Sequence, residues 1–318
     1  MHDRSNPEAA IAEAVAKYSN WGRWGPDDVL GTVNFIDEAK RREGAALVRT
    51  GVTFSLSQRF DANGPQKGWR NRNNPVHVML GTGLDAVHRE PHFPHGIAGA
   101  DDMIIMPLQC STQWDGLGHI FDHGKAWNGR PADKVVTTDG DQVTGIEHLA
   151  APVASRGVLL DVGRVIGDGE LPDGFAITEE HLTATARAHG VEVGRGDIVC
   201  VRTGQLTRVR REGWGDYAGG PAPGLSFYTA GWLHRTEIAA IATDTWGFEV
   251  RPNEFDNAFQ PLHQVAIPHI GLLVGEMWDL DALAEHCAGD GVYEFFIVAA
   301  PLPITGAVGS PVNPIAIK

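Results

Sequence analysis

The stretch GVLLDVGR, residues 157–164, opens the series of short apolar runs that decides the fold. Its pattern is typical of a buried strand. ITEEHLTATARAHG, residues 177–190, follows with the marks of a helix, because Thr178 is a good N-cap, acidic residues occupy the first turn and Gly190 ends it. GDIVCVRTG, residues 196–204, is again typical of a strand. Strands and helices are therefore predicted to alternate from residue 157 onward.

The same alternation continues to the C-terminus. Helix-like and strand-like segments follow one another as TAGWLHRTE (229–237), IAAIATD (238–244), PLHQVAIPH (261–269), IGLLVGE (270–276), DLDALAEHC (279–287) and EFFIVAAPLPI (294–304). This order predicts an α/β or mixed α+β sheet with helices packed on it. No linker divides this part of the chain, so one catalytic domain is expected over residues 51–318, preceded by a helical extension over residues 1–50.

Composition narrows the classes of partner. The 318 residues include 26 basic and 40 acidic side chains, a formal net charge of −14, which argues against nucleic acid or an anionic membrane and favours a small-molecule substrate. The three cysteines are widely spread, so no disulfide framework is implied. The first residues lack the apolar core of a signal peptide, and we expect a cytoplasmic protein.

A long passage rich in Gly, Asn, Pro and His runs to Gly99 after the strand-like segment VTFSLSQRF, residues 52–60. We expect such a passage to fold over a binding site. Within it, Arg70, Arg72 and His77 are candidates to bind a substrate carboxylate.

Four tryptophans lie in or near these segments: Trp69, Trp114, Trp127 and Trp246. Tryptophan can form the apolar wall of a pocket for a flat or cyclic substrate, but it is also ordinary core filler, so both interpretations stay open.

CSTQWDGLGH, residues 110–119, raises the question of a metal site. It places Asp115 four residues before His119, while Gln109 and Gln113 stand where metal-ligating histidines would be sought. Together with APGLS (222–226), ATDTWGFEV (242–250), LHQVAIPHIGLLVGE (262–276) and GSPVNPIAIK (309–318), it resembles the metal-dependent cyclase family, which includes kynurenine formamidases and isatin hydrolases. The resemblance runs from about residue 75 to the C-terminus.

The resemblance implies a metal site whose ligands are partly replaced. The family takes ligands from two histidines and an aspartate, and these positions fall on Gln109, Gln113 and Asp115. A later histidine and glutamate complete the family's site, and here His263 and Glu276 match them. A set of Gln113, Asp115, His263 and Glu276 is rich in oxygen and suits manganese better than zinc, although zinc stays a candidate. Without the resemblance, His263 would be interpreted as a capped surface residue or a core residue. Glu276 would be interpreted as the cap of the helix that follows it.

The resemblance also implies the chemistry. It gives His119 the role of acid and base, beside Asp115, in a hydrolase or cyclase that opens an amide, lactam or lactone bond of a small substrate. The alternative is a metal-free lyase or dehydratase, or a small-molecule binding protein that has lost its metal.

Assembly and architecture follow from the same resemblance. The implied fold is α/β, a swivelling β/β/α-type domain with a central barrel-like sheet flanked by helices. We expect a homodimer or homotetramer in which the N-terminal helices pack on a neighbouring subunit. Asp244, at the end of a strand-like run, matches a family aspartate near the site and is given a supporting role.

Overall fold

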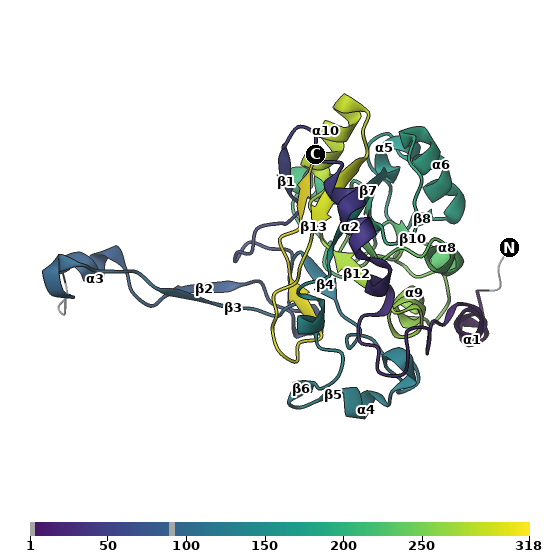
Figure 1. Ribbon diagram of the computed structural model, residues 1–318, viewed down its shortest axis with the longest axis horizontal. Coiled ribbons are helices and arrows are strands. Elements are labelled where there is room, and N and C mark those ends of the chain that lie inside the picture. The colour runs from purple at the N-terminus through teal and green to yellow at the C-terminus, as the bar shows by residue number, and fades with distance from the viewer. Residues whose placement is uncertain (1–3, 89–92) are drawn as a thin grey trace.

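A nine-stranded sheet forms the centre of the protein, whose computed structural model describes residues 4–88 and 93–318 (Figure 1). The strand order is β1-β15-β13-β7-β9-β11-β12-β4-β14. Its strands are β1 (Thr53–Ser55), β4 (Gln113–Asp115), β7 (Ala154–Asp161), β9 (Ile198–Arg202), β11 (Ala240–Thr243), β12 (Leu273–Glu276), β13 (Glu294–Val298), β14 (Gly309–Pro311) and β15 (Ile315–Ile317). Three two-stranded sheets lie outside it and pair β2 (Val76–Met79) with β3 (Asp102–Ile105), β5 (Val136–Thr137) with β6 (Gly140–Asp141), and β8 (Ala176–Ile177) with β10 (Gly224–Leu225).

The middle of the sheet is parallel and buried on both faces. Strands β7, β9, β11 and β12 run parallel, while the outer strands β4, β13, β14 and β15 pair antiparallel. Alternate residues of one strand belong to different cores: Val199 and Val201 pack in one apolar cluster, and Ile198 and Cys200 pack in the other. Strands covered on both faces are apolar throughout, which is why these runs lacked a polar alternation in the sequence.

Helices cover both faces, and the expected α/β fold with a curled, half-barrel sheet is confirmed (Figure 1). They are α1 (Pro7–Tyr18), α2 (Glu38–Ala45), α3 (Gly83–His88), α4 (Ala132–Val135), α5 (Val162–Ile166), α6 (Glu179–His189), α7 (Gln205–Glu212), α8 (Ala230–Arg235), α9 (Pro261–Val265) and α10 (Asp281–Asp290). The α6 helix has the predicted ends, with Thr178 in a capping box and Gly190 in a left-handed conformation. No helix within the two described ranges is long and apolar enough to cross a membrane.

The N-terminal helices pack on their own chain. The α1 helix buries Ile11 and Ala14 in the apolar cluster that α8 and α9 also enter, and α2 lies against β7. These helices thus have contacts within their own chain, and their contact with a neighbouring subunit stays a prediction. The boundary at residue 50 also stays a prediction.

The long passage before Gly99 divides into two parts. Its first part lies against the body, where Gln66 donates from Nε2 to the carbonyl of Cys110 at 2.8 Å and Arg72 is buried. Further along, β2, α3 and β3 form an arm that projects from the body (Figure 1). His77 lies on this arm, exposed and paired with Asp102 at 2.7 Å, so the expectation that it binds substrate in the site is corrected.

Two of the four tryptophans belong to the packing of the body. Trp114 is fully buried, crosses Trp278 with ring centroids 4.7 Å apart, and donates from Nε1 to the carbonyl of Ala299 at 2.7 Å. Gly275 makes room for it, because a Cβ there would lie 2.9 Å from the Trp114 ring. Trp127 is also fully buried. Trp114 is thus a core residue, which corrects its predicted place in a substrate pocket.

Replacing Trp114 by alanine should lower the free energy of unfolding by ~3–5 kcal/mol, the usual cost of emptying a large aromatic site in a core. Leu302→Ala removes an exposed side chain and should change it by less than ~0.5 kcal/mol. Urea denaturation followed by fluorescence and circular dichroism measures both. A Trp114→Ala protein of unchanged stability would contradict this placement.

Candidate active site

The pairing of β4 with β12 brings two acidic residues onto one face of the sheet. In their antiparallel register Gln113 lies opposite Glu276, and Trp114 lies opposite Gly275. Because side chains alternate across a strand, Gln113 and Asp115 share the face of the sheet on which Glu276 lies, while Trp114 points to the opposite face. The register therefore places two carboxylates and one amide side by side.

The amide of Gln113 links the two carboxylates. Its Nε2 donates to Oδ1 of Asp115 at 2.9 Å and to Oε2 of Glu276 at 3.2 Å. All three side chains are buried. Neighbouring buried carboxylates repel unless positive or partly positive groups lie between them. Gln113 supplies two amide hydrogens at that place.

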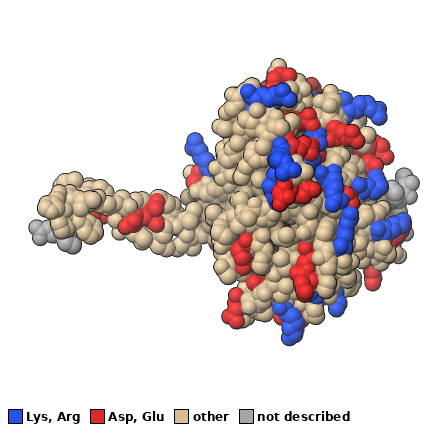
Figure 2. Space-filling model, in the orientation of Figure 1, with Lys and Arg blue, Asp and Glu red and all other residues tan. Residues whose placement is uncertain are grey.

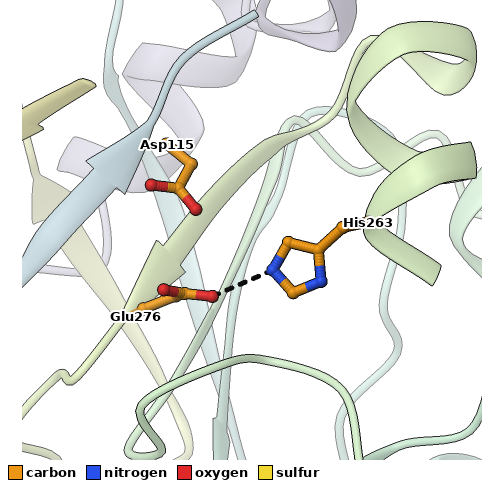
Figure 3. A group of neighbouring side chains, drawn as sticks. All are labelled: Asp115, His263 and Glu276. Carbon is orange, nitrogen blue, oxygen red and sulfur yellow. Dashed lines mark hydrogen bonds and ion pairs between the residues drawn. The ribbon is translucent and has the colours of Figure 1, made fainter. Parts of the chain in front are cut away.

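His263, in α9, completes the group (Figure 3). Its Nε2 lies 3.0 Å from Oε1 of Glu276, and its Nδ1 lies 2.5 Å from Oε1 of Glu249. One ligand atom each from Asp115, His263 and Glu276 fall within 4.8 Å of one another. The structure thus brings together the three residues that the sequence analysis assigned to a common site.

The charges of this group are strongly coupled. Burial and the nearby charge of Asp115 raise the pKa of Glu276. Burial would lower the pKa of His263, but its hydrogen bonds to Glu249 and Glu276 and their charges prevail and raise it to about 10. Without a bound cation, His263 is therefore an imidazolium held between two glutamates.

His119 reaches the site on a tight loop after β4. Gly118 has to be a glycine, because a Cβ there would lie 2.1 Å from a carboxylate oxygen of Asp141. Nε2 of His119 lies 3.7 Å from Oδ1 of Asp115. Burial lowers the pKa of His119, as do the positive charges of Arg72 and Arg70, and together they outweigh the opposing effect of Asp115. His119 is consequently neutral at pH 7.

Comparison with known proteins agrees with this geometry. The Cyclase family model, described as "Putative cyclase", matches residues 54–250. The chain belongs to this family. No curated protein matches its sequence.

Solved structures of the family share the architecture. A crystal structure described as a novel cyclase is 38% identical, has a TM-score of 0.86 and aligns over 96% of this chain and 99% of its own. Isatin hydrolase A from Ralstonia solanacearum is 16% identical over 84% of this chain and 92% of its own, with a TM-score of 0.59. A potential metal-dependent hydrolase with cyclase activity is 14% identical over 83% of this chain and 98% of its own, with a TM-score of 0.52. The last two similarities establish the fold, and family membership makes the protein an enzyme.

The donor set of this family member fits a divalent cation. Oε1 of Gln113 is buried without a hydrogen-bond partner among the described residues, so this oxygen is free to bind a cation. His263 has the arrangement typical of a metal ligand, with one ring nitrogen toward the carboxylates and the other held by Glu249. Gln109 differs from Gln113 in its surroundings. It lies against Gly309, where an added Cβ would come within 2.7 Å of the Gln109 Nε2. This nitrogen has no hydrogen-bond partner in the described part of the chain.

Three of the predicted substrate-binding residues lie in or next to the cavity of the site, although Trp246 is only 2% exposed. Arg70 lines a cavity of about 330 Å³ together with His119 and His263. Trp69 meets Trp246 edge to face with ring centroids 4.9 Å apart. Their role in binding substrate stays a prediction, whereas His77 and Trp114 lie elsewhere.

Two functional candidates escaped the sequence analysis. Glu249 accepts hydrogen bonds from the backbone of His263 and Leu262 and from the His263 ring, so it fixes the N-terminus of α9 and the ring together. The signal was present as an acidic residue in ATDTWGFEV. Arg251 lies over the rings of Trp69 and Trp246 but follows that segment and drew no attention.

Asp244 is buried beside the start of α7, and its supporting role at the site stays a prediction. Its carboxylate accepts from the backbone nitrogens of Thr203 and Gly204 and from the Thr203 hydroxyl, each at 2.8 Å. It thereby ties the end of β11 to the start of α7.

Replacing Gln113 by methionine keeps the side-chain volume but removes the amide between the carboxylates. In chelator-treated protein we expect the free energy of unfolding to fall by ~1.5–3 kcal/mol, the range for hydrogen bonds to charged groups. Gln205→Met is the matched control: it removes a buried amide whose Nε2 makes one bond, of 3.3 Å, to a carbonyl, and should cost ~0.5–1.5 kcal/mol. Equal losses in urea denaturation would show that Gln113 does not offset carboxylate repulsion.

Proposed function

We propose that this enzyme is a metal-dependent hydrolase that opens an amide, lactam or lactone bond in a small cyclic or aromatic substrate. One observation carries the proposal: ligand atoms of Asp115, His263 and Glu276 lie within 4.8 Å of one another at a buried strand edge, with Glu249 behind the histidine. Isatin hydrolases share the fold, which supports a reaction at a carbon–nitrogen bond.

Gln113, Asp115, His263 and Glu276 would hold the ion. Three of these four ligands offer oxygen and one offers nitrogen, a set that favours manganese over zinc. His263 must lose the proton that it carries between the glutamates, so binding is expected to release it. When bound, the divalent ion supplies a positive charge that favours ionisation of water and polarises a carbonyl oxygen.

His119 performs the proton transfers in this proposal. Its pKa is lowered by burial, so its ring nitrogen is unprotonated and can accept a proton from the attacking water. The resulting imidazolium donates that proton to the departing nitrogen or oxygen. Asp115, 3.7 Å away, stabilises the imidazolium between the two transfers.

The substrate enters through the cavity that His119, His263 and Arg70 line. About 330 Å³ suits a small molecule. The rings of Trp69 and Phe259, with centroids 5.8 Å apart, offer a wall for a flat substrate. An aromatic or cyclic compound therefore matches this mouth.

A metal-free lyase or dehydratase, or a binding protein, is the second candidate. It is favoured by the contacts of Gln113 and of the His263 imidazolium, which compensate the charges of Asp115, Glu249 and Glu276 without a cation. Metal analysis of the purified protein separates the two candidates.

Asp115→Ala and His119→Ala should fail in different ways. Asp115→Ala removes one of four metal ligands, of which only His263 offers a nitrogen. The protein should therefore lose both its metal and its hydrolytic activity. His119→Ala should keep the metal and lower kcat by ~10²–10⁴-fold, the usual effect of losing a positioned acid or base. The measurements are elemental analysis by mass spectrometry and hydrolysis of a panel of aromatic amides, lactams and lactones that includes isatin.

Two variants serve as controls for this pair. Asp133→Ala removes an exposed carboxylate and His123→Ala removes an exposed imidazole near the loop, and both should keep metal and activity. A wild-type protein that binds no metal and stays active after exhaustive chelation would replace the hydrolase with the metal-free lyase.

A further inference from the structure

Arg72, near the mouth of the site, lacks the close counter-ion that a buried guanidinium group requires, and Arg70, which is exposed, and Arg251, which is partly buried, lie near it. Arg72 is only 7% exposed, yet its side chain makes no close ion pair or hydrogen bond within the described ranges, and its charge acts on Glu276 only from a distance. Arg202, which is 5% exposed, pairs with Asp161 and Asp281 at 3.0 and 2.9 Å. The same residue type at the same depth is thus paired in one place and unpaired in the other.

These arginines share two tryptophans. The guanidinium carbon of Arg72 lies 5.3 Å from the centroid of Trp246, and that of Arg251 lies 5.5 Å from Trp69 and 5.9 Å from Trp246. Arg70 lies 6.0 Å from Trp69. We call Arg70, Arg72, Arg251, Trp69 and Trp246 the arginine–tryptophan cluster.

Two hydrogen-bond donors of the cluster have no acceptor within the described residues. Nη1 of Arg251 and Nε1 of Trp246 are buried and have no hydrogen-bond acceptor among the described residues. Leaving such donors unpaired costs ~1–3 kcal/mol each, more for a charged group. A bound acceptor would remove that cost.

The balance of charged side chains near the site also favours binding of an anion. The nearby carboxylates are those of Asp115, Glu249 and Glu276, which are already bonded to Gln113 and His263. Three guanidinium groups lie near these three carboxylates, which already accept hydrogen bonds from the Gln113 amide or the His263 ring, in a chain whose net charge is −14. A bound divalent ion would add positive charge to this group. Balancing the site's own acids therefore does not account for all three arginines.

We propose that the arginine–tryptophan cluster binds a carboxylate of the substrate, and that the substrate class is a small aromatic carboxylic acid. The planar donors of arginine match a carboxylate, and the tryptophans offer apolar faces to the attached ring. The proposal rests on the proposed function in one respect. The bond that is broken would lie between the cluster on one side and Asp115, His263 and Glu276 on the other.

Calorimetric titration of the full chain with benzoate, and with neutral benzamide as the matched compound, tests this proposal. Chelator-treated protein is used, so that benzoate has no metal to bind and a missing metal does not affect the result. Benzoate should bind at least ~10-fold more tightly than benzamide, and Arg72→Gln or Arg251→Gln should each remove most of that preference. Arg187→Gln, which removes an exposed charge on α6, should leave it unchanged.

Arg72→Lys gives a further check, because lysine keeps the charge without the planar donors and should restore only part of the preference. Equal binding of benzoate and benzamide, or a preference that survives both Gln variants, would overturn the assignment. Failure of the proposed hydrolase appears instead as missing metal and missing hydrolysis.

The projecting arm carries a second, independent inference. Every residue of β2 and β3 is exposed. The arm also holds eleven of the 21 large apolar side chains that are exposed in the described part of the chain: Val76, Val78, Met79, Leu80, Leu84, Val87, Phe93, Ile97, Met103, Ile104 and Ile105. An isolated two-stranded ribbon is marginally stable in water, so this arm needs something to pack against.

The described surface of the arm is largely apolar. Val78 lies opposite Met103 and Val76 opposite Ile105, which makes one face of the ribbon wholly apolar. Figure 2 shows the arm as mostly uncharged, with some acidic side chains. The sequence of residues 76–105 has one Arg and no Lys against four acidic residues, which disfavours an anionic membrane or nucleic acid as the partner.

We infer that a second copy of this chain covers the arm. The eleven side chains expose on the order of 1,000 Å², close to the ~800 Å² per partner of a stable protein interface and too much for a soluble monomer. A surface this apolar needs a permanent partner, and another copy is available wherever the chain is made. Because the arm leaves the body after Arg72 and returns before Gln109, the same contact would steady both sides of the site.

Sedimentation equilibrium at micromolar concentration tests this inference. The wild type should have the mass of a dimer or a larger closed assembly, and Val78→Lys with Met103→Lys should give a folded monomer, because neither residue supports the body. Val48→Lys with Val292→Lys, which charges exposed valines elsewhere, should leave the assembly intact. A monomeric wild type, or an unchanged assembly in the arm variant, would contradict the inference.

Discussion

The buried approach of the carboxylates of Asp115 and Glu276 is the constraint on which the site depends. The β4–β12 register places both groups on one face of the sheet, and both are buried there. Such a pair is tolerated only with positive charge or strong donors between its members. The amide of Gln113, the ring of His263 and the ion proposed to bind there are alternative ways to meet the same requirement.

The sheet explains why chemistry gathers at this edge. The carboxyl ends of parallel strands lie at the same edge of a sheet, and ligands bind at this edge in α/β proteins. In this sheet, each parallel strand has a charged residue at its carboxyl end. Asp161 ends β7, Arg202 ends β9, Asp244 follows β11 and Glu276 ends β12. Asp161 and Arg202 neutralise one another, and Asp244 anchors α7. Glu276 remains at the end of the last parallel strand, where the antiparallel β4 places Gln113 opposite it and Asp115 on the same face of the sheet.

Local signals in the sequence predicted the elements well. The apolar runs of β7 and β9 and the caps of α6 all follow from short-range rules, and the structure has them. One further signal was available and unused: in a strand, Gln113 and Asp115 on the site face place Trp114 on the other face. The misplacement of Trp114 was therefore avoidable.

The remaining features depend on distant pairings. Asp115 and Glu276 are 161 residues apart, and the family resemblance rather than any spacing rule brought them together. Glu249 gains its role only because α9 begins against it, and Arg251 gains its role only because Trp69 folds over it. The arm could not be foreseen, since a passage rich in glycine and proline does not say whether it folds back or projects.

Anomalous scattering tests the central claim most directly. Crystals grown with manganese chloride, measured above and below the manganese absorption edge, should give one strong anomalous peak between Asp115, His263 and Glu276, with Oε1 of Gln113 turned toward it. Absence of a peak, with Nε2 of Gln113 still bonded to both carboxylates, would contradict the account and leave the amide and the imidazolium as the only compensation of the buried charges.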